Sequence, residues 1–267
     1  MWIALVVRVL RDTLAVACVL LILPSNACAQ SGKNVTHQSL VWFGYFNTLK
    51  FDERWSLVTD IQDRHFIDGF VRNQFDVRTQ LARTLGSGWD VRAGGSFWLQ
   101  GATNPAVEDV PTVPELRPHV EFDQKQPFHW GNINQRFRFE ARYYHNVDNG
   151  QLSEGYTFLN YRLRYRFGFD LPLIRAANGI ERLSFRISDE VMLNLGARIV
   201  LNTFDQNRFQ ADLAFGITKL LSVELGYVNW FQQRYTGTDY YNRDILRFAV
   251  VHKIDLSHKN AATMESK

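Results

Sequence analysis

Arginine side chains recur at every second residue in the middle of the chain, interspersed with a few carboxylates. Residues 133–143 read INQRFRFEARY, which places Arg136, Arg138, Glu140 and Arg142 on one side of an extended segment and apolar residues on the other. Guanidinium groups spaced in this way can pair with carboxylates of neighbouring strands through two parallel hydrogen bonds, or they can attract an anion. The chemistry that these residues indicate is therefore ionic rather than nucleophilic.

The elements that hold these side chains are predicted to be β-strands, because apolar and polar residues alternate with a period of two. Eleven segments show the pattern, and turn-forming residues such as Gly86-Ser87-Gly88 separate them. The segments are 39–49, 54–65, 71–82, 89–100, 115–123, 133–144, 156–169, 182–193, 207–218, 221–234 and 244–256. In most of them one face is apolar and the other is rich in Arg, Gln, Asp and Glu.

The start of the chain has the composition of an export signal. Basic residues accompany an apolar run at 14–23, and a small-residue cleavage site ends at Ala29. We expect residues 1–29 to be a signal peptide that is removed near Ala29. Cys28 leaves a lipid-modified signal open as an alternative, although the residues before it fit that motif poorly. Because Cys18 is the only other cysteine, the mature chain is predicted to have no disulfide.

Charge and hydropathy narrow the class of protein. The chain has 30 Lys and Arg against 27 Asp and Glu, a balance that argues against a nucleic-acid binder. After Gln30 no apolar stretch is long enough for a membrane-spanning helix. An exported chain of alternating strands can still cross a membrane as a closed sheet with its apolar face toward lipid. We therefore predict an all-β protein, a closed antiparallel transmembrane barrel of the outer membrane with a charged, Arg-rich lumen. A soluble periplasmic sandwich is the competing fold.

The strand number is predicted from a rule as well as from the pattern. Bacterial single-chain barrels have an even number of strands, so a short strand is expected to lie hidden within 30–38 or 194–206. We favour twelve strands, with ten as the alternative. Connections after every second segment, such as 101–114, are longer and more polar than the turns between them, as in the outer loops of such barrels. The barrel domain is predicted to span 30–256, and a polar tail, 257–267, follows it.

Several local strings resemble the domain of unknown function 2490 family, a group of predicted outer-membrane barrels. They are Glu115-Leu116-Arg117-Pro118, the Arg-x-Arg-x-Glu-x-Arg run of 136–142, the arginines at 162, 164 and 166, Asp189-Glu190 with Asn194, FDQNR at 204–208 and ELGY at 224–227. The resemblance covers nearly the whole mature chain. It implies a barrel but no activity, cofactor or catalytic residue. The polar tail departs from the aromatic ending of many barrels of this membrane.

The inward-facing charges form the candidate site. Neighbouring strands lie about 4.8 Å apart, which is close enough for cross-strand ion pairs. The predicted network comprises Arg117, Glu121, Arg136, Arg138, Glu140, Arg142, Arg162, Arg164, Arg166, Glu190, Arg208, Asp212 and Glu224. A barrel of ten to twelve strands is narrow, so we favour a lumen plugged by its own ion pairs over a path for a small anion.

Signals for catalysis or for metal binding are weak. His37 and Ser39 have a His-x-Ser spacing that resembles outer-membrane lipid hydrolases, but the accompanying Asn-Gly is absent. Asp189 and Glu190 are adjacent on a strand, so only one of them can face the lumen. No catalytic residue, cofactor or metal site is predicted. The expected function is non-enzymatic, in the envelope or in small-solute passage, and a lipid-active hydrolase is the alternative.

Aromatic residues near strand ends are predicted to form girdles at two membrane interfaces. They are Trp42, Tyr45, Trp55, Trp89, Trp98, Trp130, Tyr143, Tyr156, Tyr165, Tyr227, Trp230, Tyr235, Tyr240 and Tyr241. The expected partners are outer-membrane lipid and the barrel-assembly machinery, without nucleic acid, and the sequence names no solute.

Overall fold

The computed structural model describes residues 33–107, 111–196 and 199–257. The chain divides into two units, Met1–Lys33 and Asn34–Lys267. The predicted signal peptide, including Cys28 and Ala29, lies outside the described residues, as does the predicted tail apart from Ser257. The predictions for these segments therefore stay predictions. All strands and contacts described below belong to the second unit.

The described part of the second unit contains eleven strands. They are β1 (Asn34–Lys50), β2 (Trp55–Phe66), β3 (Arg72–Gly86), β4 (Trp89–Gln100), β5 (Val113–Phe128), β6 (Gly131–Asp148), β7 (Gln151–Arg175), β8 (Glu181–Leu195), β9 (Phe204–Gly216), β10 (Leu221–Gln233) and β11 (Asp239–Asp255). Each overlaps one of the eleven segments in which apolar and polar residues alternate. Period-two alternation therefore located the strands.

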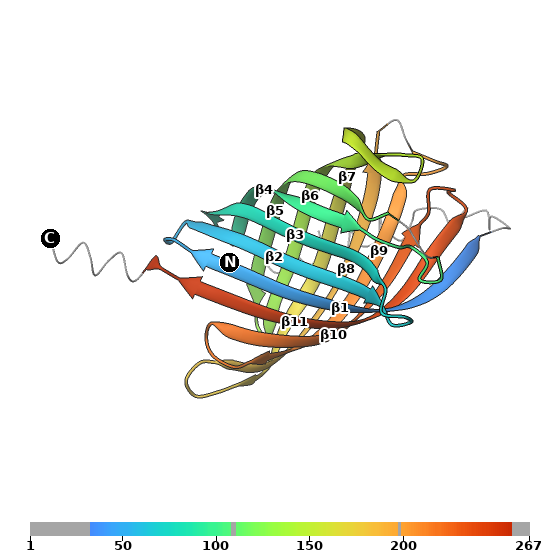
Figure 1. Cartoon of the computed structure of the whole chain (residues 1–267). Helices are drawn as coiled ribbons and strands as arrows, with labels where there is room; N and C mark the ends of the chain where they lie inside the picture. The colour runs from blue at the N-terminus through green and yellow to red at the C-terminus, as the bar shows by residue number, and fades with distance from the viewer. Residues whose placement is uncertain (1–32, 108–110, 197–198, 258–267) are drawn as a thin grey trace, which may run out of the picture. The chain divides into compact units, whose positions relative to one another are not determined.

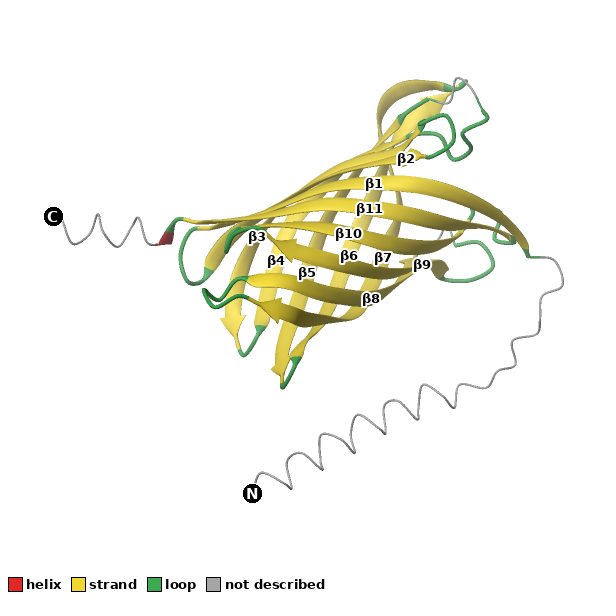
Figure 2. Cartoon of the chain, turned by 90° about the horizontal axis from the view of Figure 1, so that it is seen from below, coloured by secondary structure: helices red, strands yellow, loops and turns green. Residues whose placement is uncertain are grey.

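The eleven strands form one closed barrel, in which each strand pairs with its neighbours along the chain (Figures 1 and 2). All of these consecutive pairs are antiparallel. The barrel closes through β1 and β11, which pair in parallel from Asn34 opposite Asp239 to Lys50 opposite Asp255. The first and last strands are thus joined along their whole length, and neither leaves an open edge.

The favoured count of twelve strands, and the alternative of ten, are wrong. Residues 34–38 belong to β1 and form no separate strand. The described part of 194–206 contains only the end of β8 and the start of β9. The parity rule assumes that every neighbouring pair is antiparallel. A parallel pair between the first and last strands removes that requirement, so an odd number of strands can close.

The connections gather at two ends of the barrel. One, here called the turn end, carries 51–54, 87–88, 129–130, 176–180 and 217–220, together with the end of β11. The other, the loop end, carries 67–71, 101–112, 149–150, 196–203 and 234–238, together with the start of β1. These two ends agree with the predicted division into short and long connections, with one exception.

The exception is the connection between β6 and β7, which was expected to be a long polar loop. It is the two-residue turn Asn149-Gly150, whose φ angles of 51° and 78° suit the left-handed turn that a tight hairpin requires. The strands continue instead, and Asp148 still pairs with Gln151. Beyond Tyr144 and before Tyr161 this hairpin has no partner in β5 or β8.

The two faces of the wall differ sharply in polarity. Apolar side chains such as Phe137, Leu163 and Leu225 are exposed on the outer face, and each of the eleven strands presents at least one. On the inner face Arg138 and Glu140 are each only 2% exposed. This arrangement matches the predicted alternation, because side chains of a strand point to opposite faces in turn.

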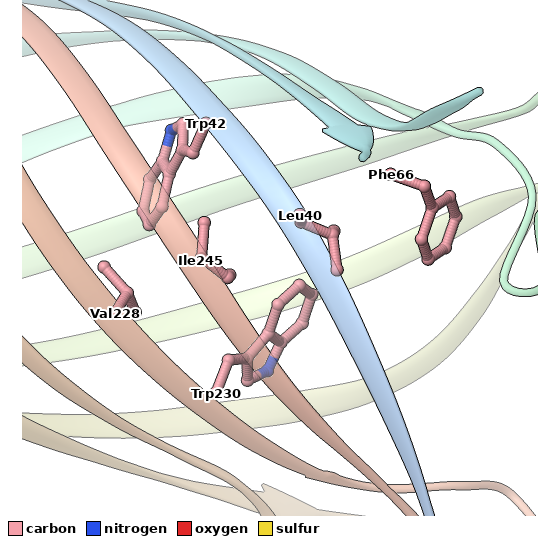
Figure 3. Packing of buried hydrophobic residues seen from close by; sticks show 6 residues of the cluster. All are labelled: Leu40, Trp42, Phe66, Val228, Trp230 and Ile245. Atoms are coloured by element: carbon pink, nitrogen blue, oxygen red, sulfur yellow. The ribbon is translucent and has the colours of Figure 1, made fainter. Parts of the chain in front are cut away.

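One stretch of the inner wall is apolar and was not predicted. Leu40, Trp42, Phe66, Val228, Trp230 and Ile245 form a buried cluster beside the seam where β1 meets β11 (Figure 3). Trp98 is also buried, at 1% exposure. The girdle prediction is therefore wrong for Trp42, Trp98 and Trp230, and also for the buried Tyr240 and Tyr241.

No helix in the described part of the chain has the length and apolarity needed to cross a membrane.

Candidate functional site

The centre of the interior is occupied by a ring of alternating charges from β5, β6, β7 and β8. Its members in order are Glu121, Arg138, Glu140, Arg164, Glu190 and Arg136. Arg164 donates to the two oxygens of Glu190 at 2.9 and 3.0 Å and to Glu140 at 2.9 Å. Arg136 donates to Glu190 at 2.5 Å and lies 3.7 Å from Glu121. Arg138 closes the ring, because it pairs with Glu121 and lies 3.6 Å from Glu140.

The pairs of this ring are mostly diagonal rather than straight across the strands. Glu140 lies directly opposite Arg162 in register, yet the two approach only to 4.0 Å. The long guanidinium arm of Arg164 reaches Glu140 from the next inward position instead. Each carboxylate therefore contacts more than one arginine, which fixes the relative positions of four strands from inside the barrel.

Three other predicted arginines lie toward the loop end. Arg117 donates to both oxygens of Glu115 at 2.6 and 2.7 Å. Arg142 donates to the same carboxylate at 2.7 Å and to the hydroxyl of Tyr144. Arg162 pairs with Asp205 at 2.9 Å. This second cluster is contiguous with the ring, since Arg162 also lies 4.0 Å from Glu140.

Two predicted carboxylates sit on the far wall, and their partner is an arginine that the prediction missed. Arg247 of β11 pairs with Asp212 and Glu224 at 2.8 Å each. Glu224 also pairs with Arg186. The network likewise gains Arg78, which pairs with Asp60 at 2.8 Å, and Arg64, which lies 3.4 Å from Asp76.

Arg64 and Arg78 lie on the inward face that period-two alternation assigns to their segments, together with Asp60 and Asp76, although the predicted network does not include them. The same alternation assigns Arg247 to the inward face of β11, together with Arg243. The signal for these residues was thus present in the sequence. Which arginine pairs with which carboxylate depends on rotamers and on strand register, and these required the structure.

Arg166 and Arg208 differ from the rest of the predicted network. Among the residues that the structure describes, Arg166 forms no ion pair and donates no hydrogen bond. Arg208 donates to the side-chain oxygen of Gln206 at 2.9 Å but has no carboxylate within 4 Å in the described chain. They lie on either side of Glu190 in register, on β7 and β9.

A stack of guanidinium and indole groups crosses the interior between the central ring and the loop end. Arg64 lies 4.2 Å from the ring centre of Trp42, 5.1 Å from that of Trp98 and 5.9 Å from that of Trp230. Arg117 stacks on Trp98 at 3.9 Å, and Arg208 and Arg243 stack on Trp230 at 4.4 and 4.5 Å. Arg247 also lies over Trp42, at 5.7 Å. We call Arg64, Arg117, Arg208, Arg243 and the three tryptophans the Arg–Trp layer. Such contacts are attractive because the indole face is electron-rich.

The remaining space divides into chambers on either side of this layer. A central cavity of about 240 Å³ is lined by Arg64 and Trp42, and a loop-end cavity of about 390 Å³ is lined by Arg243. These two cavities share no lining residue. A turn-end cavity of about 380 Å³ shares Arg166 and Ser188 with the central one. The interior is thus open from the turn end to its middle and is interrupted there by the Arg–Trp layer.

The residues of the hydrolase alternative lie away from this interior. His37 and Ser39 are both exposed on the outer face of β1, and neither side chain has a hydrogen-bond partner among the described residues. Of the adjacent acids, Glu190 faces inward, whereas Asp189 lies exposed outside and accepts from Asn207 at 2.9 Å. No three His, Cys, Asp or Glu side chains of the described segments meet as metal ligands would.

Comparisons with known proteins give a family and a structural likeness. The family described as "Protein of unknown function (DUF2490)" matches residues 40–242. A solved structure of the NanC porin, in a rhombohedral crystal form, aligns over 80% of this chain and 99% of the porin, with 14% sequence identity and a TM-score of 0.48. No curated protein matches the chain.

Proposed function

The chain belongs to the DUF2490 family, proteins of unknown function, and because the family brings no activity we propose the function from the barrel itself. The protein is an integral barrel of the outer membrane, non-enzymatic, whose charged lumen is closed by the ionic ring and the Arg–Trp layer. Its role lies in the envelope or in gated passage of a small solute. No observation in the described structure favours the lipid-active hydrolase.

The reversed polarity of the wall carries this proposal. A barrel in water would hide its apolar face and expose its charges, because apolar surface is driven out of water. Here Phe139 is 44% exposed on the outside, while Glu121 and its partner Arg138 are buried inside. An apolar outer surface on every strand around an ionic interior is what a lipid environment stabilises.

The ends of the barrel suggest its orientation. Outer-membrane barrels have short turns on the periplasmic side and longer loops outside. By this rule the turn end faces the periplasm, so the start of β1 lies at the outer surface and β11 ends in the periplasm. Membrane lipid and the barrel-assembly machinery are then the partners.

Location and fold are tested together by fractionation and gel migration. The full chain, expressed in a Gram-negative host, should be recovered with outer-membrane fractions. Unheated samples should migrate differently from boiled ones, because a closed barrel resists unfolding in detergent. Recovery of the protein in the soluble periplasmic fraction would refute the proposal.

Closure of the lumen leads to a prediction about conductance. The indoles of Trp98 and Trp230 are each 1% exposed, and they fill the interior between the chambers. The purified barrel should therefore show little or no steady conductance in a planar bilayer. The double variant Trp98→Ala/Trp230→Ala should show discrete open steps that favour anions, because arginines then line the continuous path.

The matched control removes two tryptophans from the outside of the barrel. Trp55 and Trp130 are exposed, so Trp55→Ala/Trp130→Ala should stay as silent as the unmodified protein. A large steady conductance of the unmodified barrel would show that the lumen is open. An interior double variant that folds and yet stays silent would show that the Arg–Trp layer is not what closes it.

A further inference from the structure

The central cavity has more positive than negative charge along its wall, and the excess can be assigned to particular residues. Its lining carboxylates are Asp60, Glu121 and Glu190. Each is already held by an arginine: Asp60 by Arg78, Glu121 by Arg138 and Glu190 by Arg164. The other lining arginines also have carboxylate partners: Arg136 pairs with Glu190, and Arg64, Arg92 and Arg247 pair with Asp76, Asp123 and Asp212 outside the cavity wall. Among the described residues, Arg166 and Arg208 are the lining arginines that have no carboxylate within 4 Å.

Glu190 cannot neutralise these two arginines, although it lies between them in register. Its first oxygen accepts hydrogen bonds from Arg136 at 2.5 Å and from Arg164 at 3.0 Å, and its second accepts from Arg164 at 2.9 Å. Both arginines are half-buried, and a charge that is taken partly out of water without a counter-charge is destabilising. Arg166 and Arg208 line one cavity, so a counter-ion that satisfies both must enter that cavity.

A second row of residues, one inward position nearer the turn end, adds hydrogen-bonding groups and space. Gly168, Ser188 and Gln210 lie opposite one another on β7, β8 and β9. The Ser188 hydroxyl has no hydrogen-bond partner among the described residues, and Ser188 and Gln210 line both the central and the turn-end cavities. A Cβ at Gly168 would lie 2.7 Å from the carbonyl oxygen of Ile187 and 2.8 Å from the Cβ of Ser188, so glycine allows β7 and β8 to approach closely beside Ser188.

The two rows therefore surround a small volume from three adjacent strands. Arg166 and Arg208 stand two strand spacings apart, roughly 10 Å between backbones, and both side chains point inward. The turn-end cavity gives access to it, because Arg166 and Ser188 line both cavities. Two uncompensated guanidinium groups with a free hydroxyl between them match a doubly charged oxyanion.

We infer that the central cavity is a binding site for a small divalent oxyanion, reached from the turn end, with Arg166, Arg208 and Ser188 as its ligands. The shared chemistry is two negative charges on oxygen, as in phosphate, sulfate or a short dicarboxylate. The inference deepens the proposed function by naming the solute class that the closed lumen holds. Anion binding is measured on the folded, purified barrel, whereas the proposed location is tested by fractionation. The barrel can therefore be found in the outer membrane and bind no anion, or bind an anion and be found elsewhere.

The test is calorimetric titration of the purified full chain in detergent, at constant ionic strength, with sulfate, inorganic phosphate, succinate and chloride. The divalent anions should bind at one site, and chloride should bind far more weakly. Stronger binding of phosphate and sulfate would assign the site to tetrahedral oxyanions, and stronger binding of succinate to dicarboxylates. Arg166→Gln and Arg208→Gln should each weaken binding by about tenfold or more, the effect of one lost charge-assisted contact.

Two further variants keep the test decisive. Arg175→Gln, an exposed change on the same strand as Arg166, should leave affinity unchanged. Ser188→Asp should place a carboxylate beside Arg166 and abolish anion binding without lowering thermal stability. Sulfate also stabilises proteins because it is excluded from their surface, and this general effect should be the same in all of these variants. Binding that survives Arg166→Gln and Ser188→Asp, or that Arg175→Gln weakens equally, would overturn the inference.

Discussion

Phe139→Arg is expected to prevent insertion of the barrel into a lipid bilayer. Phe139 lies in the middle of β6, is 44% exposed on the outer face, and stacks on Tyr161 at 5.1 Å between ring centres. An arginine on the lipid face at the bilayer midplane costs about 2–4 kcal/mol. The measurement is the fraction of protein that acquires heat-modifiable migration after dilution from denaturant into lipid vesicles, and Phe139→Leu should behave like the unmodified chain.

The same chemical change at a different depth is the informative control. Trp130 is exposed in the turn between β5 and β6, where the membrane would end, so Trp130→Arg should cost only about 0–1 kcal/mol. Arg138→Phe, on the inward face next to Phe139, should also be milder for insertion because it puts no charge in lipid. Equal insertion of Phe139→Arg and Trp130→Arg would contradict the assignment of the outer face to lipid.

Much of the fold could be predicted because strand alternation is a local property of the sequence. The run that contains Arg138 and Phe139 indicates both a strand and its two faces without knowledge of any other segment. The strand count failed for a different reason. Pairing between β1 and β11 joins residues at opposite ends of the chain, and the alternation of each strand is the same whether they pair in parallel or not.

The buried tryptophans were assigned to membrane girdles because they lie near strand ends, although strand alternation places them on the inward face. Trp98 lies between Phe97 and Leu99, so alternation alone places it on the inward face with Ser96. Its position near a strand end suggested a membrane girdle instead. The structure follows the alternation, since in a narrow barrel a large inward side chain near the end must fill the interior.

Glu190→Gln is expected to destabilise the barrel more than any other single neutralisation in the ring. Glu190 accepts three hydrogen bonds from Arg136 and Arg164, and Arg166 and Arg208 flank it in register. Removing its charge leaves buried guanidinium groups unpaired, which costs about 3–5 kcal/mol. Equilibrium unfolding by guanidinium chloride in detergent, without sulfate or phosphate, should show the loss as a lower midpoint.

The matched control lies on the same strand. Glu181 pairs with Arg175 at 3.5 Å, and both side chains are about half exposed to solvent, so Glu181→Gln should change stability by less than about 1 kcal/mol. The double variant Glu190→Gln/Arg164→Gln should lose less than the sum of its single changes, because each removes the other's partner. Additive losses would mean that the two groups do not interact. A cost for Glu190→Gln no greater than that for Glu181→Gln would mean that the ring is solvated and the interior wet, since only burial makes an unpaired charge expensive.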